Sequence, residues 1–197
     1  MRELRLHGRG GQGTVIASKL LAVALFLEGR QVQSFPMFGV ERRGSPVTAF
    51  LRVDDAPLKL RCEIQEPDEL IVLDPTLIGT TDITAGLKTG GRILINTDQA
   101  PEDFPQLLEK AHVSTVDASG IAVRHGLGGR AQPIVNTAIL GAFAADTGGI
   151  SVANMCDAIR EEVPIQIDAN IAAAMEAMDA VRHAPMRGTQ VPEVARA

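Results

Sequence analysis

The stretch Gly8-Arg9-Gly10-Gly11-Gln12-Gly13 decides the fold of this 197-residue chain, because it stands between a predicted strand and a predicted helix. Residues 3–7 alternate polar and apolar side chains, as a strand does, and residues 14–27 carry helix formers up to a stop at Gly29. The glycines fit the spacing G-x-G-x-x-G, which permits a tight turn and a close backbone approach to phosphate. The start of the following helix offers free N–H groups and a partial positive charge to an anion.

The same spacing also fits a turn that only joins a strand to a helix, so it does not identify a ligand by itself. A dinucleotide-binding Rossmann domain would carry an acidic residue at the end of its second strand, where the carboxylate holds a ribose hydroxyl. The second strand is predicted over residues 31–35 and ends at Pro36 without an Asp or Glu. This omission argues against NAD as the ligand and favours another phosphate-bearing molecule.

The composition indicates an ordinary globular protein, with 45% hydrophobic and 22% charged residues. The length suits one domain with a small appendage, predicted as residues 1–184 and a tail over 185–197. Tryptophan and tyrosine are absent, so the core must be aliphatic, and a site that stacks nucleic-acid bases is not expected. The net charge of −5 also argues against nucleic-acid binding.

The sequence predicts neither a membrane span nor a resident metal. Its longest unbroken apolar run, residues 20–27, is too short to cross a bilayer, and the N-terminus lacks a signal-peptide pattern. Cys62 and Cys156 lie far apart and the four histidines have no ligand spacing, so no iron–sulfur cluster or zinc site is expected in this chain. Among the histidines, His7 stands beside the glycine turn. Together these features predict a cytoplasmic protein that binds no metal.

The order of the predicted elements indicates an α/β fold, namely a Rossmann-like three-layer sandwich with a mostly parallel sheet and an inserted β-hairpin. The hairpin would comprise residues 47–53 and 58–62, and the buried-type strands would be residues 69–74, 92–96 and 113–117, the last of the chain. Helices are predicted over residues 76–88, 101–111, 119–124, 133–146, 151–163 and 168–183.

A loop over residues 35–46 follows the second predicted strand, at the sheet edge where open α/β folds bind their ligands. Arg42 and Arg43 stand there beside glycines and could clamp a phosphate, because guanidinium groups bind phosphate bidentately. The loop could equally be solvated, with Glu41 paired to the two arginines. The residues alone leave both interpretations open.

The glycine turn, followed by Phe38-Gly39-Val40-Glu41-Arg42-Arg43-Gly44, resembles a known family. The chain is similar to the gamma subunit of the 2-oxoacid:ferredoxin oxidoreductases, of which pyruvate:ferredoxin oxidoreductase is the best known. Residues 49–53, 136–143 and 170–179 agree with the family as well, so the resemblance covers residues 3–183. The two motifs are specific in combination, whereas either one alone would not be.

The resemblance implies one subunit of a larger enzyme that is not active alone. Such complexes oxidatively decarboxylate a 2-oxoacid and transfer the acyl group to coenzyme A. Thiamine diphosphate with magnesium lies between the alpha and beta chains, and [4Fe-4S] clusters lie on partner chains such as a ferredoxin-like delta subunit. Ferredoxin is the usual electron acceptor, and NAD through a flavin subunit is the other option. The gamma chain is implicated in coenzyme A binding.

The resemblance also implies a set of coenzyme A contacts, with no catalytic residue or metal ligand in this chain. The glycine turn would bind phosphate through backbone N–H groups, Arg43 would act as the charged clamp, and Glu41 would orient Arg43. The implied contact residues are Gly8, Gly10, Gly11, Gln12, Gly13, Phe38, Glu41, Arg43, Gly44, Ser45, Asn136 and Thr137. Met37, Phe38 and Val40 depart from the frequent Ser-Tyr and Pro of the family, and Ser45 replaces a second glycine.

Three functional hypotheses follow. The first is a coenzyme A-binding gamma subunit, and the second is a purely structural subunit of the same complex whose glycine turn packs against a partner. The third is a stand-alone NAD(P)-binding Rossmann protein, which the missing acidic residue disfavours. The sequence does not choose between pyruvate, 2-oxoglutarate, a branched-chain oxoacid and an aryl glyoxylate such as phenylglyoxylate, because the oxoacid would bind on other chains.

Overall fold

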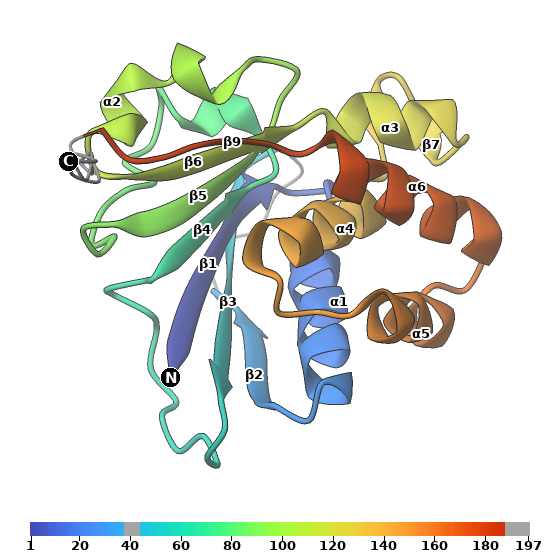
Figure 1. The fold of residues 1–197 in the computed structure, drawn as a ribbon, viewed down its shortest axis with the longest axis horizontal. Coiled ribbons are helices and arrows are strands. Elements are labelled where there is room, and N and C mark those ends of the chain that lie inside the picture. The colour runs from blue at the N-terminus through green and yellow to red at the C-terminus, as the bar shows by residue number, and fades with distance from the viewer. Residues whose placement is uncertain (38–43, 188–197) are drawn as a thin grey trace, which may run out of the picture.

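The computed structural model describes residues 1–37 and 44–187. In this part of the chain, one seven-stranded sheet with the order β2-β3-β1-β4-β5-β6-β9 runs through the molecule, with helices against it (Figure 1). Its strands are β1 (Arg2–Arg9), β2 (Gln31–Pro36), β3 (Pro46–Asp54), β4 (Glu69–Val72), β5 (Gly91–Asn96), β6 (Ala111–Val116) and β9 (Arg182–Ala184). A separate small hairpin joins β7 (Gly128–Gly129) to β8 (Gln132–Pro133).

The sheet is mixed, with most strands running in one direction. β1 pairs in parallel with β4, β4 with β5, and β5 with β6. β3 lies antiparallel between β1 and β2, and β9 is antiparallel to β6. Strands β1, β2, β4, β5 and β6 therefore share one direction, which confirms the predicted α/β fold with a mostly parallel sheet.

Helices cover the two faces of the sheet unequally. The longer ones pack into one apolar cluster on a single face, and they are α1 (Thr14–Leu27), α3 (Ala118–Arg124), α4 (Asn136–Thr147), α5 (Val152–Glu162) and α6 (Ile167–Ala180). The short elements η1 (Pro75–Leu77) and α2 (Pro105–Leu108) cover the other face, and η2 (Pro101–Asp103) precedes α2. On β4, Ile71 packs into the first cluster, while Leu70 and Val72 pack into the second. A strand buried on both faces needs such a continuous apolar run, because successive side chains point to opposite faces.

The inserted hairpin consists of β2 and β3, so the prediction that residues 58–62 pair with 47–53 was wrong. Both edges of β3 are occupied, since it pairs with β1 on one side and with β2 on the other. Residues 58–62 form no strand and are held to the sheet by a side chain, because the buried Arg52 guanidinium reaches Cys62 Sγ at 3.7 Å and the Glu63 carbonyl at 3.5 Å. The alternation of apolar residues there does not mark a strand, and Leu60 is exposed.

Two predicted helices shrink and one strand was missed. Residues 76–88 contain η1 followed by turns, and residues 101–111 contain η2 and the four-residue α2. Prolines at 101 and 105 each begin one of these short elements and prevent one continuous helix. Helix α6 ends at Ala180, after which residues 182–184 form the edge strand β9, so β6 is not the last strand.

The predicted tail begins directly after β9, and residues 188–197 lie outside the described part of the chain. None of the helices formed by residues 1–37 and 44–187 combines the length and apolar character that a bilayer crossing requires.

Candidate functional site

The glycine turn lies where the sequence places it, at the carboxyl end of β1 and the start of α1. Gly11 and Gly13 have φ angles of 94° and 76°, a left-handed conformation that favours glycine. A Cβ on Gly8 would lie 2.1 Å from Thr14 Oγ1, so this position also excludes a side chain. Gly8 and Gly13 of the predicted spacing, together with Gly11, therefore make the tight turn.

The segment after β2 returns to this turn. The Gly10 N–H donates to the Ser45 carbonyl at 2.9 Å, and the Gly44 N–H donates to the Gly10 carbonyl at 3.0 Å. Gly44 and Ser45 thus lie against the glycine turn, as the sequence predicts for a loop at the carboxyl edge of the sheet. Phe38, Glu41 and Arg43 lie outside the described residues, so their predicted contacts with a ligand stay predictions.

Two helix N-termini meet at the turn. Gly13 is the residue before α1, and Asn136 is the first residue of α4; a Cβ on Gly13 would lie 2.7 Å from the Asn136 amide nitrogen. Neither helix has a side-chain cap or an acidic residue in its first turn, whereas α5 is capped by Ser151 Oγ. Uncapped N–H groups at two adjacent helix starts are ready to bind an anion.

The Asn136 side chain carries an amide oxygen that has no hydrogen-bond partner among the described residues. Its residue is 6% exposed, and its Oδ1 atom is buried without a hydrogen bond. Buried polar atoms are nearly always paired, and each exception calls for an explanation. A ligand that lies between the two helix starts would supply the missing partner.

A cavity of about 390 Å³ opens at this junction. Its lining residues are Gly11, Gln12, Gly13, Ile16, Gln132, Pro133, Ile134 and Asn136. Ile16 and Ile134 are 55% and 47% exposed, so the cavity has an apolar rim beside its polar floor. Its lining carries no charged side chain among the described residues, and the electrostatic attraction for an anion comes there from the helix N-termini.

A second cavity of about 360 Å³ lies beside the first and shares Gln12, Gln132 and Pro133 with it. Asp74, Asp98 and Asp117 line it, against the single cation of Arg130. Three carboxylates repel phosphate. The second cavity is therefore less suited to an anion than the first.

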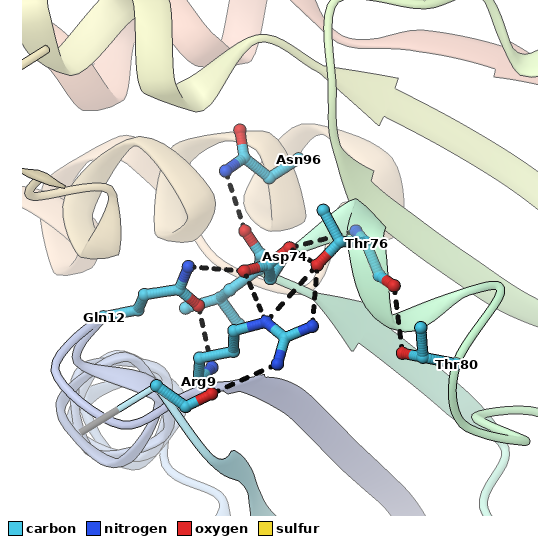
Figure 2. A network of polar contacts seen from close by, with 8 residues as sticks. Arg9, Gln12, Asp74, Thr76, Thr80 and Asn96 are labelled. Carbon is cyan, nitrogen blue, oxygen red and sulfur yellow. Dashed lines mark hydrogen bonds and ion pairs between the residues drawn. The ribbon is translucent and has the colours of Figure 1, made fainter. Parts of the chain in front are cut away.

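A polar network closes the space between β1 and β4 (Figure 2). Asp74, two residues after β4, accepts hydrogen bonds from Gln12 Nε2 at 2.7 Å, Thr76 N at 2.9 Å and Thr76 Oγ1 at 2.6 Å, and forms an ion pair with Arg9 Nε at 3.2 Å. Burial raises the pKa of the Asp74 carboxyl, but the hydrogen bonds from Thr76 and Gln12 outweigh it and hold the pKa below its usual value. Asp74 is therefore a carboxylate at neutral pH.

Asp74 stands where a dinucleotide-binding domain could carry its acidic residue. The strand that lies parallel and next to β1 is β4, not the second strand in sequence, and an acidic residue does follow it. Three hydrogen bonds and the ion pair with Arg9 already engage both oxygens of this carboxylate. A ribose hydroxyl would have to compete with these partners, which disfavours NAD.

Comparison with known proteins assigns the family. The model of the pyruvate ferredoxin/flavodoxin oxidoreductase family matches residues 3–180. The chain belongs to this family. The gamma subunit common to the pyruvate and ketoisovalerate oxidoreductases of Thermococcus kodakarensis is 51% identical over 164 residues, which cover 82% of this chain and 86% of that protein. This chain is thus a gamma-type subunit of a 2-oxoacid oxidoreductase, as the sequence motifs predict.

Solved structures agree with the gamma-type assignment. The crystal structure of the pyruvate oxidoreductase subunit PORC from Thermotoga maritima has a TM-score of 0.77 at 33% identity, covering 93% of this chain and 98% of that one. The fold alone is shared with a 2-oxoglutarate:ferredoxin oxidoreductase from Magnetococcus marinus, with a TM-score of 0.67 at 20% identity, covering 90% of this chain and 30% of that one.

In this gamma-type chain most predicted contact residues meet at one place. The structure brings together Gly8, Gly10, Gly11, Gln12, Gly13, Gly44, Ser45 and Asn136. Thr137 is the exception, because its buried hydroxyl donates to Asn170 Oδ1 at 3.0 Å and ties α4 to α6. This hydroxyl is already used within the fold, and the predicted contact of Thr137 with a ligand stays a prediction. The side chain of Gln12 is also committed, to Asp74 and to the Arg9 N–H.

Sequence reasoning missed Arg9, Asp74 and Thr76. Arg9 occupies a variable position of the glycine motif, and Asp74 reads as the last residue of a buried-type strand. The signal that could have found Asp74 is its place after a parallel strand, at the edge where ligands bind. His7 is bonded to Arg5 instead: Arg5 Nε donates to its Nε2 at 3.0 Å, and burial together with the nearby Arg5 charge lowers the pKa of His7 to about 4. No three metal-binding side chains converge within residues 1–37 and 44–187.

Proposed function

We propose that this gamma-type chain binds the phosphate groups of coenzyme A at the junction of α1 and α4, within a complex that converts a 2-oxoacid to an acyl-coenzyme A. The observation that carries the proposal is the meeting of two uncapped helix N-termini beside a buried Asn136 amide without a partner for its oxygen. Phosphate oxygens accept the free N–H groups, and a donor on the ligand satisfies Asn136 Oδ1.

The shape of the cavity supports coenzyme A over a simple phosphate. Coenzyme A joins charged phosphates to a pantetheine arm that carries both methyl groups and amides. The exposed side chains of Ile16 and Ile134 offer an apolar surface for such an arm beside the helix starts. The related enzyme from Magnetococcus marinus was solved with coenzyme A and succinyl-coenzyme A bound, which supports the same ligand class for this complex.

The remaining chemistry belongs to partner chains in this proposal. Thiamine diphosphate with magnesium supplies the decarboxylation chemistry when bound between alpha and beta subunits, and [4Fe-4S] clusters on those and a ferredoxin-like delta subunit accept the electrons. Electrons then leave to ferredoxin, or to NAD through a flavin subunit. The role of this chain is to hold coenzyme A so that its thiol reaches the acyl group. The names of the relatives favour pyruvate and ketoisovalerate as oxoacids, and a cytoplasmic location stays a prediction.

Asn136→Asp in the assembled complex tests the proposal. The substitution keeps the size of the side chain but adds a negative charge at the proposed phosphate site. The Michaelis constant for coenzyme A is expected to rise roughly tenfold or more, since about 1.4 kcal/mol of lost binding is tenfold. Reduction of the complex by the 2-oxoacid without coenzyme A is expected to persist. Asn154→Asp makes the same change near the start of α5 and should leave the Michaelis constant unchanged.

Two results would contradict the proposal. An unchanged Michaelis constant in an intact Asn136→Asp complex would remove coenzyme A from this junction. A variant that folds but no longer joins its partner chains would instead favour the purely structural subunit, because the exposed Ile16 and Ile134 would then be part of a subunit interface.

A further inference from the structure

We infer that Asp74 is a positioning residue that shapes the coenzyme A site before the ligand arrives, an inference that rests on the proposed function above. Its carboxylate connects η1, through the neighbouring Thr76, to the glycine motif more than sixty residues away, through Gln12 and Arg9. These contacts engage both carboxylate oxygens of Asp74, so we do not expect Asp74 to bind a ligand directly. Asp74 therefore acts on coenzyme A through the residues it holds.

The first consequence concerns the glycine turn. Glycines with positive φ angles have many accessible conformations, so a free turn would lose entropy when it closes on phosphate. Gln12 spans this turn, because its Nε2 donates to Asp74 while its Oε1 accepts the Arg9 N–H at 2.7 Å. The Gln12 N–H in turn donates to the Arg9 carbonyl at 3.0 Å. Asp74 thereby fixes the side chain that keeps the turn in its binding shape.

The second consequence concerns the Gly44–Ser45 segment, which bonds to the glycine turn. The Arg9 guanidinium, paired with Asp74, also donates from Nη1 to the Gly44 carbonyl at 3.1 Å. Gly44 and Ser45 bond to Gly10 through the backbone, so Arg9 adds a side-chain anchor to the same contact. Thr76 adds to this network, since its hydroxyl donates to Asp74 Oδ1 and accepts from Arg9 Nη2 at 2.9 Å (Figure 2). One carboxylate thus holds both the glycine turn and the contact of that turn with Gly44 and Ser45.

Asp74→Asn in the assembled complex tests this role. The amide cannot accept all four donors and leaves the Arg9 charge without its counter-ion. The loss of a hydrogen bond to a charged group loosens the glycine turn, and we expect the Michaelis constant for coenzyme A to rise roughly tenfold. The maximal rate at saturating coenzyme A is expected to stay unchanged, because Asp74 does not contact the ligand. Amide hydrogen exchange of residues 10–14 in the ligand-free complex is expected to accelerate, and added coenzyme A should reverse it.

Asp117→Asn is the matched control. Asp117 follows β6 at the same edge of the sheet and caps α3 by accepting the Gly120 N–H at 2.7 Å, but no hydrogen bond joins it to the glycine turn in the described structure. This variant should change neither the Michaelis constant nor the exchange of residues 10–14. A general loss of structure at this edge would affect both variants, whereas positioning affects Asp74→Asn alone.

The outcomes separate the inference from the proposed function. Unchanged hydrogen exchange of residues 10–14 in Asp74→Asn overturns the positioning role. Faster exchange in Asp74→Asn also overturns it if the Michaelis constant for coenzyme A stays unchanged in this variant while Asn136→Asp still raises that constant. If neither Asn136→Asp nor Asp74→Asn affects coenzyme A, the proposed function itself fails. Should Asp74→Asn not assemble, Thr76→Val removes one donor to Asp74 and the acceptor of Arg9. It is expected to give a smaller change in the same direction, and no change would overturn the inference.

Discussion

The substitution Gly13→Ala separates two reasons why this position holds glycine. The first is conformational, because Gly13 has a φ angle of 76° and an L-residue loses roughly 1–2 kcal/mol in the left-handed region. The second is steric, because the new Cβ would lie 2.7 Å from Asn136 Nδ2 and 2.8 Å from Asn136 Oδ1. Forcing an atom into a packed site costs typically about 1–3 kcal/mol more.

Gly148→Ala provides the matched control. Gly148 follows α4 with a φ angle of 62°, and a Cβ there would meet nothing within 4 Å. It should therefore show only the conformational term, on the order of 1–2 kcal/mol. Chemical denaturation of the chain is expected to give a loss of about 2–5 kcal/mol for Gly13→Ala. In the assembled complex, only Gly13→Ala should also weaken coenzyme A, since it displaces Asn136.

The double variant Gly13→Ala with Asn136→Ala completes the cycle. Removing the amide relieves the steric term, so the double variant should be more stable than the sum of the two single variants indicates. Equal losses for Gly13→Ala and Gly148→Ala would refute the reasoning, because the contact with Asn136 would then contribute nothing. Additive behaviour in the cycle would refute it as well.

Three further predictions concern other parts of the chain. Burial lowers the pKa of His7 from 6.5 to about 4, so the unfolded chain binds more protons between these pH values. Acidification from pH 6.5 to 4 should therefore remove about 3 kcal/mol of stability. Denaturation of His7→Gln should show a flatter pH dependence of stability, and a profile identical to that of the unchanged chain would contradict the assignment. Asp146→Ala removes the buried carboxylate that Ser114 Oγ and His183 Nδ1 contact at 2.6 Å and 2.9 Å. Stability should fall by roughly 1–3 kcal/mol, and hydrogen exchange of β9 should accelerate. Unchanged exchange would show that these three side chains do not hold β9 in the sheet. Arg43→Ala in the complex should raise the Michaelis constant for coenzyme A roughly ten- to hundredfold. Arg43→Lys should recover only part of this loss, because an ammonium group lacks the planar pair of N–H donors of a guanidinium group. An unaltered Michaelis constant would leave Arg43 without a role in binding.

Local patterns were sufficient to predict the elements that form the sheet centre and the glycine turn. The predicted strands 69–74 and 92–96 contain the continuous apolar runs 70–73 and 93–95, and such runs are typical of strands buried on both faces. The turn was predictable because its glycine spacing restricts the backbone over a few residues. Asn136 could be included only through the family resemblance, since nothing in its local sequence indicates that α4 starts beside Gly13.

The parts that sequence reasoning missed depend on contacts between distant residues. Whether residues 58–62 pair with β3 depends on β1 already occupying that edge, which no local pattern contains. The edge strand β9 is three residues long and continues a helical pattern, so its pairing with β6 decides its structure. Likewise the parallel neighbour of β1 is β4 and not β2, so the acidic residue at this edge follows β4 and not the second strand of the sequence.

The two halves of the candidate site come from segments that are far apart in the chain. Gln132 Nε2 donates to the Gly11 carbonyl across 121 residues of sequence, and Asn136 follows four residues later. Contacts between such distant residues require a large loop to close, and loop closure of this kind slows folding. A ligand that needs both helix starts recognises only chains that have completed this closure. At a ligand concentration one hundred times its dissociation constant, it would stabilise the folded chain by about 2.7 kcal/mol. Coenzyme A availability would then influence how much of this subunit survives in its folded form.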